Sequence, residues 1–335
     1  MKVISTESIN PTDIVKELNA QANIADYAAC VVFVHAELDL HATISLLDIG
    51  IPHIGSTVLS VYCDGNAIEE TITIWLIPEQ YKPKVGFLTD VADNNRFVFA
   101  LSDKDKNLDK LAKQFSFAGG TASDCWTFDR TSLILNGEIL TNTTVAVSLE
   151  AEYSTLHSSG WQTIPGTESI ITEADGACVK RIGQNTAVEF YNTFIPSADA
   201  YGAYPIFLPQ HGVYRAALNV DLSEGSITFS SDIPQGATVF ATTTRRNALI
   251  ASANQLIAES RHIMPDTSVL TILVSCAARN LMLSDVPHFE HKAIFDINKN
   301  VLTAYLYSEF VPQADGTTLL QNQHAVISKI RRATK

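Results

Sequence analysis

The chain lacks the features of a membrane protein or a nucleic-acid-binding protein. No apolar stretch reaches the roughly 18 residues of a membrane span, and the segment after Met1 is polar, unlike a signal-peptide core. Lysine and arginine number 23 against 36 aspartates and glutamates, a formal net charge of −13. Because nucleic-acid binding needs clustered positive charge, we expect no nucleic-acid partner. The lack of a membrane span and of a signal-peptide core leads us to expect no membrane insertion and a cytoplasmic location.

Cysteine is scarce and unpatterned. The five cysteines are spread along the chain with no Cys-x-x-Cys pair: Cys30, Cys63, Cys125, Cys178 and Cys276. An odd, dispersed set indicates neither a disulfide framework nor a zinc site. We expect most of these thiols to be small core residues in a reducing compartment.

The chain contains enough apolar sequence for a large folded core. It has 335 residues, of which 46% are hydrophobic and 18% charged, so a well-buried globular protein of two domains is expected. The β-prone run 29–34, a helical pattern at 40–47 and a strand at 51–57 indicate a β-α-β crossover and a partly parallel sheet. No short repeat or low-complexity tract is detected.

The remaining patterns alternate strands with a few helices. Turn signals at Asn136-Gly137 and Asp175-Gly176 predict antiparallel hairpins, and residues 197–202 are predicted to connect the two halves. Helices are expected at 10–18, 107–115, 186–194 and 246–263; strands are expected at 71–77, 132–135, 144–149, 169–172, 177–182, 214–220, 226–229, 238–242, 269–274, 301–306 and 325–330. The sequence therefore predicts an α+β fold in two parts, with mixed β-sheets flanked by helices.

The segment Ser275-Cys276-Ala277-Ala278-Arg279 is the strongest candidate for chemistry. It places a thiol and a guanidinium where the strand at 269–274 is expected to surface, and arginine offers a planar fork to a carboxylate or phosphate. The alternative is a packed thiol beside an arginine that pairs with Glu309. A catalytic hypothesis makes Cys276 a nucleophile with His324 as base and Glu309 as orienting acid, although no catalytic signature surrounds them.

Two other segments allow two interpretations each. Gly119-Gly120 precedes a hydroxyl-rich turn whose amides could hold an anion, or the glycines serve a tight turn or close packing. Asp124 is expected to cap that turn or to fix a ligand amine. The pair His288-x-x-His291 lies in Pro287 to His291, where a solvated loop is favoured over a zinc site because a third ligand is not evident.

The order of short motifs resembles the FIST domain family over residues 23–330. The resemblance rests on Ile54-Gly55-Ser56-Thr57, on the segment from Phe117 to Asp124, on Ser159-Gly160-Trp161, on Ala187 with Tyr191, on Val213-Tyr214-Arg215, on Ile233-Pro234 with Gly236, on Ser275 to Arg279, on Ser308-Glu309-Phe310 and on Leu320-Gln321-Asn322. The chain departs from the family at Ser308, where glycine is usual, and at Gln321, where the family has His before Asn. The implied domains are an N-terminal one at 23–200 and a C-terminal one at 201–332.

The resemblance implies a bacterial sensory protein that binds a small molecule between its two parts, with an amino acid as one suggested ligand. FIST modules are often fused to output domains, and this chain has no room for one, so it would signal to a separate partner such as a histidine kinase or cyclase. The expected ligand-binding residues are Gly55, Ser56, Thr57, Gly119, Gly120, Asp124, Arg215, Cys276, Arg279, Glu309 and Asn322. One alternative is a haem-binding nitric-oxide sensor, with His157 or His211 as the iron ligand. The other is a cysteine-dependent hydrolase that uses Cys276, so enzymatic activity stays undecided.

Overall fold

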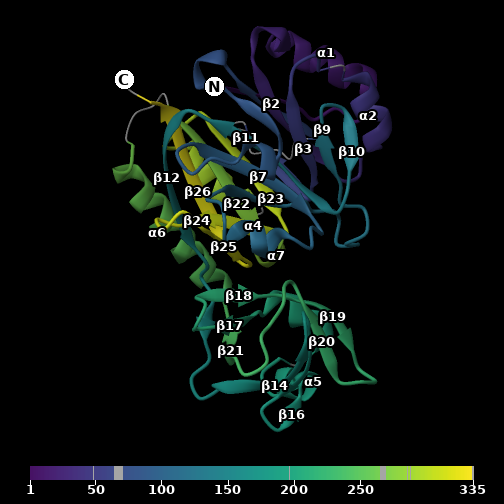
Figure 1. Ribbon diagram of the computed structural model, residues 1–335, viewed down its shortest axis with the longest axis vertical. Helices are drawn as coiled ribbons and strands as arrows, with labels where there is room; N and C mark the ends of the chain where they lie inside the picture. Colours follow the sequence, from purple (N-terminus) through teal and green to yellow (C-terminus); the bar gives the residue numbers. More distant parts are fainter. Residues whose placement is uncertain are drawn as a thin grey trace. The chain divides into compact units, whose positions relative to one another are not determined.

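The chain folds into two compact units, whose elements are labelled in the computed structural model (Figure 1). The described residues are 1–47, 49–63, 71–195, 197–264, 269–284, 286 and 288–333. Unit 1 contains Met1–Ser158, Ala253–Leu320 and Ala325–Lys335, and unit 2 contains Ser159–Ser252 and Gln321–His324. Both units are therefore discontinuous in sequence. The linear domains at 23–200 and 201–332 stay a prediction.

Unit 1 contains three mixed sheets, counted over the residues that the structure describes. The first has the order β1 (Lys2–Thr6), β5 (Ile72–Ile77), β2 (Ala29–His35), β3 (His53–Val58), β9 (Leu133–Leu135) and β10 (Glu138–Leu140). The second has the order β6 (Lys84–Phe87), β11 (Thr143–Leu149), β7 (Phe97–Asp103), β8 (Ala118–Thr121), β24 (Ser308–Pro312) and β25 (Thr318–Gln321). The third has the order β12 (Ala151–Ser158), β26 (Ala325–Arg332), β22 (Leu270–Cys276), β23 (Val301–Leu306) and β4 (Ser60–Tyr62).

Helices, most of them short, connect these strands. They are α1 (Pro11–Gln21), α2 (Leu40–Leu46), α3 (Leu88–Val91), α4 (Leu108–Ala112), α6 (Arg246–His262), α7 (Ala277–Met282) and α8 (Phe289–Phe295), with 3-10 turns at Ile24–Asp26 and Glu79–Tyr81. The Asn10 side chain caps α1, the helix expected at 10–18, by accepting from the Thr12 amide. β2 and β3 are parallel and joined through α2, so the predicted crossover and the α+β class are confirmed.

Helices α7 and α8 are absent from the sequence-based assignment. The expected solvated loop at Pro287 to His291 is wrong for its described part, because α8 begins at Phe289 and buries Glu290 and His291; Pro287 lies outside the described residues. Buried polar residues in this helix gave no apolar stripe from which to predict it.

The three sheets of unit 1 repeat one arrangement. In each, the first four strands run in the order first, fourth, second, third by sequence: β1-β5-β2-β3, β6-β11-β7-β8 and β12-β26-β22-β23. The second and third strands of each repeat are parallel, and the fourth is antiparallel to the second. The link between the third and fourth strands then extends a neighbouring sheet: β9–β10 extends the first, β24–β25 the second and β4 the third. The repeats thus interlock in a closed cycle, and residues 159–252 of unit 2 are inserted into the third.

One hydrophobic core is shared by the three repeats. Val31, Phe99 and Ile272 occupy equivalent positions on β2, β7 and β22. Each pairs with a residue at or next to the start of the adjacent parallel strand, which is β3, β8 or β23. All three are buried in the same cluster. The side chains at equivalent positions differ in size, which is why the sequence shows no repeat.

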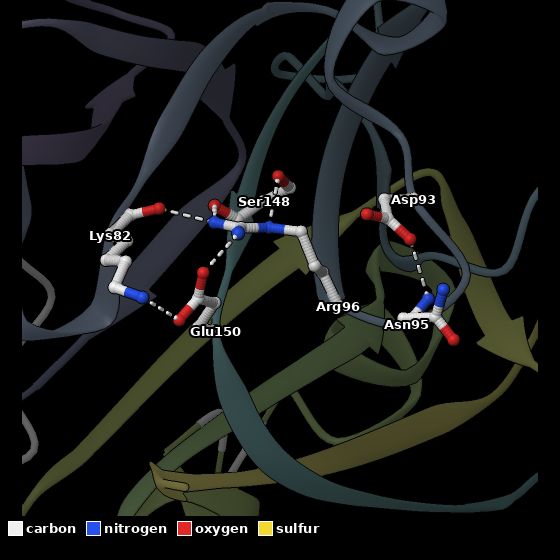
Figure 2. A network of polar contacts seen from close by, with 6 residues as sticks. All are labelled: Lys82, Asp93, Asn95, Arg96, Ser148 and Glu150. Atoms are coloured by element: carbon white, nitrogen blue, oxygen red, sulfur yellow. Dashed lines mark hydrogen bonds and ion pairs between the residues drawn. The ribbon is translucent and has the colours of Figure 1, made fainter.

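A buried arginine joins strand ends in the second repeat (Figure 2). Arg96 donates from Nε to Ser148 Oγ at 3.1 Å and from Nη2 to the carbonyls of Ser148, at 3.1 Å, and of Lys82. It also pairs with Glu150, 3.2 Å from Nη1, and Glu150 in turn pairs with Lys82 at 2.7 Å. Lys82 has φ 42°, so Arg96 satisfies the carbonyl of a residue in the left-handed region.

Replacing Arg96 by methionine is expected to destabilise the protein by roughly 2 kcal/mol, because buried carbonyl oxygens lose their donor. Urea unfolding followed by circular dichroism measures the change. Glu150→Gln is the matched control and should cost much less, since Glu150 is 44% exposed. Equal losses in the two variants would show that the ion pair, and not the carbonyl contacts, stabilises this strand end.

Unit 2 is mostly antiparallel. Its strands are β13 (Gln162–Thr163), β14 (Ser169–Asp175), β15 (Cys178–Ile182), β16 (Asn185–Thr186), β17 (Ile206–Leu208), β18 (Val213–Arg215), β19 (Ala217–Asp221), β20 (Ser226–Phe229) and β21 (Thr238–Thr243), with helix α5 (Ala187–Asn192) and a 3-10 turn at Ala198–Ala203. The predicted hairpin at Asp175-Gly176 joins β14 and β15. A capping box between Thr186 and Glu189 starts α5, as expected for a helix near 186.

Candidate ligand-binding site

A polar pocket of about 440 Å³ opens where the parallel strands β2 and β3 end in unit 1. Ligands commonly bind at the carboxyl ends of parallel strands, and the volume lies within the usual range for small-molecule sites. The lining residues come from the turn after β2, the start of α2, the end of β3 and the segment around β9 and β10: Ala36, Glu37, Leu38, Asp39, Leu40, His41, Thr57, Arg130, Ser132 and Ile139.

Charged side chains distinguish this pocket from a larger one. A pocket of about 690 Å³ at the start of β3 is lined mainly by aliphatic residues together with His53 and Asn136. Burial lowers the pKa of His53, although the bond between its Nδ1 and the Ile51 carbonyl opposes that shift. Its imidazole is therefore neutral at pH 7. The smaller pocket carries acidic and basic groups that could orient a charged ligand, so it is the better candidate.

Two segments predicted to bind ligand meet beside the pocket. The Thr57 carbonyl accepts from the Ser123 amide at 3.2 Å, and Thr57 Oγ1 accepts from the Ser132 amide at 3.1 Å. Ser123 Oγ accepts from the Leu59 amide at 2.7 Å and donates to the Tyr305 carbonyl at 2.6 Å. The ends of β3, β8 and β23 thus converge through backbone and hydroxyl contacts. The sequence-predicted turns at Gly55 to Thr57 and Gly119 to Asp124 are brought together by this junction.

Asp124 organises the loop that follows β8. Its carboxylate accepts from the backbone amides of Thr127, Phe128 and Arg130 at 3.0, 3.1 and 3.0 Å, and from the Tyr307 hydroxyl. The side chain is 1% exposed. Of the two expected roles, capping is therefore present, and the carboxylate fixes the backbone that carries Arg130 into the pocket.

The electrostatics of Asp124 favour the charged carboxylate. Burial by itself would raise its pKa, but hydrogen bonds from Tyr307, Arg130, Thr127 and Phe128 together lower the pKa below the ordinary 3.8. Burial, followed by the bond to Asp124, raises the pKa of Tyr307, which therefore stays protonated and donates.

Acid is expected to loosen the Asp124 loop. Because the folded pKa is depressed, the stabilisation is fully present above about pH 3.8 and is lost as pH falls through the lower folded value. Acrylamide quenching of Trp126, which is 39% exposed, should increase over this range. Asp124→Asn should abolish the pH dependence, whereas Asp129→Asn on the same loop should retain it. A pH response that is identical in all three proteins would contradict this assignment.

The predicted glycines have a packing role. An added Cβ would lie 2.4 Å from the Val32 carbonyl at Gly55, 1.9 Å from the Ala100 carbonyl at Gly119 and 2.3 Å from the Ser308 carbonyl at Gly120. Neighbouring strands therefore approach these positions too closely for a side chain. Their direct contact with ligand stays a prediction, as does that of Ser56, which is buried on β3.

Cys276 and Arg279 do not surface as expected. They are 3% and 0% exposed, because the chain turns into α7 directly after β22 and folds back over the sheet. Arg279 pairs with Glu290, with Nε at 2.9 Å and Nη2 at 2.5 Å from Oε1. Glu290 Oε2 also accepts from Ser275 Oγ at 2.6 Å and Tyr305 OH at 3.3 Å. This buried network gives Arg279 a structural role, and a direct ligand contact by Arg279 or Cys276 stays a prediction.

The remaining candidates lie in both units. Glu309 is buried on β24 opposite Gly120, in unit 1. Arg215 and Asn322 belong to unit 2, where Asn322 Oδ1 accepts from Ser230 Oγ at 2.5 Å. Gln321, the neighbour of Asn322, bonds to the Tyr214 amide and the Gly212 carbonyl at 3.2 and 2.9 Å. The segment 321–324 is therefore tied into unit 2 by polar contacts.

The histidines give no metal cluster. Across the described residues, no three His, Cys, Asp or Glu side chains gather as metal ligands would. His157 and His211 are exposed, so their role as haem ligands stays a prediction. His291 is fully buried, with Nδ1 3.0 Å from Thr303 Oγ1 and its ring stacked on Tyr62.

Sequence reasoning missed three residues that shape these sites. Arg130 follows a polar loop and has no motif around it; Tyr307 lies one residue before the family-like Ser308; Glu290 was assigned to a loop. The nearest signal was the order Asp124, Trp126, Phe128, Arg130, which concentrates aromatic and charged residues in a short loop. Only the folded chain shows which of them Asp124 holds in place.

These observations describe an α+β protein built from interlocking sheets, with a polar pocket at the ends of parallel strands. The chain belongs to the FIST domain family: residues 28–185 match the FIST N domain and residues 187–312 match the FIST C domain. The resemblance inferred from the motifs is thereby confirmed, and FIST domains are sensory domains. No curated protein matches the chain. Within its described part, no helix has both the length and the apolar character needed to cross a membrane.

Proposed function

We propose that this FIST protein is a sensor that binds a small zwitterion, an amino acid or a similar metabolite, in the pocket at the ends of β2 and β3. The single observation that carries the proposal is the composition of that pocket. Arg130 and the carboxylates of Glu37 and Asp39 line the same cavity of about 440 Å³, beside the hydroxyls of Thr57 and Ser132. A cavity with one cationic and two anionic side chains matches a ligand that carries both charges.

Arg130 and Asp39 have distinct roles. Arg130 presents a planar fork that suits a carboxylate, and its backbone is held by Asp124. Asp39 caps α2 through the Ala42 amide at 3.0 Å, so its carboxylate has a fixed position from which to accept a ligand ammonium. Thr57 and Ser132 supply smaller polar groups between the two ends.

Signal output follows from the loop that carries Arg130. A ligand carboxylate that contacts Arg130 would favour one arrangement of the loop after β8, and a separate partner protein would read that arrangement. A histidine kinase or cyclase is the kind of partner that the family suggests. Hydrogen exchange of residues 122–132 with and without ligand tests this step.

The test of the function is calorimetric titration of the purified protein with each of the common L-amino acids. Binding of at least one, weakened tenfold or more in Arg130→Met and less in Arg130→Lys, is expected, because lysine keeps the charge but loses the fork. Arg261→Met, an exposed arginine on α6, is the matched control and should bind as the wild type does. Absence of binding to every amino acid, or binding unaffected by Arg130→Met, overturns the proposal.

A further inference from the structure

A partly exposed aromatic cluster forms where the loop between β8 and β9 meets Tyr307, the residue between β23 and β24. It consists of Trp126, Phe128 and Tyr307, with ring centroids 4.5 Å apart for Phe128 and Tyr307, 5.9 Å for Trp126 and Tyr307, and 6.4 Å for Trp126 and Phe128. Trp126 is 39% exposed, whereas Trp75 and Trp161 are buried. Large aromatic side chains are usually buried, so a cluster held at the surface suggests recognition.

The cluster is held rigidly, at a cost in backbone conformation. Trp126 and Phe128 have φ of 68° and 58°, in the left-handed region that bulky residues rarely adopt. The Tyr307 hydroxyl accepts from the Trp126 amide at 3.0 Å and donates to Asp124, which also accepts from the Phe128 amide. Strain of this kind persists only where surrounding contacts over-determine it. The rings are therefore positioned before any ligand arrives.

The same carboxylate connects the cluster to the pocket. Asp124 accepts from the Arg130 amide at 3.0 Å, and Arg130 and Ser132 line the cavity beside β2 and β3. The loop thus carries the rings of Trp126 and Phe128 and, shortly after them, Arg130, which is proposed to bind the ligand carboxylate. Trp126 and Phe128 precede Arg130 by four and two positions on this loop.

We infer that the ligand of this site carries a planar aromatic ring in addition to its zwitterionic group, as an aromatic amino acid does. The inference rests on the proposed function, since Arg130 must hold the ligand carboxylate. The ring stacks on the platform of Trp126 and Phe128, and the ammonium meets the acidic side of the pocket. Opposite charges at the pocket and aromatic faces on its loop are complementary to this one class of molecule.

A pair of matched ligands tests the inference on the full-length protein. L-Phenylalanine and L-cyclohexylalanine have similar size and the same charged end, but only phenylalanine has an aromatic face. Phenylalanine is expected to bind roughly three- to tenfold more tightly. It should also shift the emission of Trp126, because the other tryptophans are buried.

Substitutions of Trp126 and Phe128 test whether these two rings cause the preference for phenylalanine. Trp126→Leu should abolish the preference for phenylalanine over cyclohexylalanine, and Trp126→Phe should restore most of the preference. Phe128→Leu should reduce the preference by itself and provides a second variant if Trp126→Leu fails to fold.

The outcomes separate the two proposals. If no amino acid binds, the proposed function fails and the ring preference falls with it. If amino acids bind through Arg130 but phenylalanine and cyclohexylalanine bind equally, with no change in Trp126 emission, the ring preference fails and the zwitterion site stands. Concentration-dependent self-association of the wild type that Trp126→Leu removes would show a second copy on the platform and would also overturn the inference.

Discussion

Replacing Arg279 by methionine is expected to destabilise the protein by about 3–5 kcal/mol. The guanidinium is fully buried and contacts Glu290, which is 1% exposed. Without Arg279, the Glu290 carboxylate would remain buried beside Ser275 and Tyr305, whose hydroxyls cannot neutralise its charge. The free energy of unfolding from urea titration measures the loss.

A set of variants separates the pair from its parts. Glu290→Gln should cost less than Arg279→Met, because the amide keeps an oxygen that can accept from Arg279. The double variant Arg279→Met with Glu290→Met removes both charges and should recover part of the stability. An Arg279→Met protein that keeps its stability but loses ligand binding would contradict the structural role and support the direct contact expected from the sequence.

The second large effect is expected at Gly119. Alanine there would place Cβ 1.9 Å from the Ala100 carbonyl oxygen, on a backbone with φ of 125°. Neither atom can move without separating β7 from β8, whose pairing includes Ala100 with Gly119. We expect a loss of about 3 kcal/mol or more, from backbone strain and overpacking together.

Gly137 provides the matched control for Gly119. It also has a left-handed φ, 86°, but an added Cβ would meet nothing within 4 Å. Gly137→Ala should therefore report the conformational cost alone, about 1 kcal/mol. Thermal unfolding of both variants gives the comparison. Similar losses would show that the close approach of Ala100 is relieved at little cost.

Most strands could be predicted because their residues carry a local signal. The β-prone run at 269–274 became β22, Leu270–Cys276, and the alternating segment at 71–77 became β5, Ile72–Ile77. The long helix at 246–263 likewise matches α6 because its apolar residues recur on one face. Helices α7 and α8 were missed because burial of polar groups, and not an apolar stripe, holds them.

The partner of Arg279 shows why the site was harder to predict than the elements. Glu309 follows the next predicted strand, 301–306, and an ion pair between the ends of the two strands is the simplest expectation. The structure pairs Arg279 with Glu290, a partner that the sequence did not suggest, because α7 and α8 both lie between β22 and β23 and bring the two side chains together. Because α8 was not predicted, Glu290 could not be proposed as the ion-pair partner of Arg279.

By itself the sequence determined the α+β class, the family and most strands, because hydrophobic period, turn residues and motif order are local or linear properties. It also singled out Thr57 and Asp124, whose segments meet beside the pocket. Only the tertiary structure decided that three repeats close into a cycle, that Arg279 is buried against Glu290, and that Asp124 fixes Arg130 and the aromatic platform. These features depend on contacts between residues far apart in the chain, and no local pattern encodes which of them will meet.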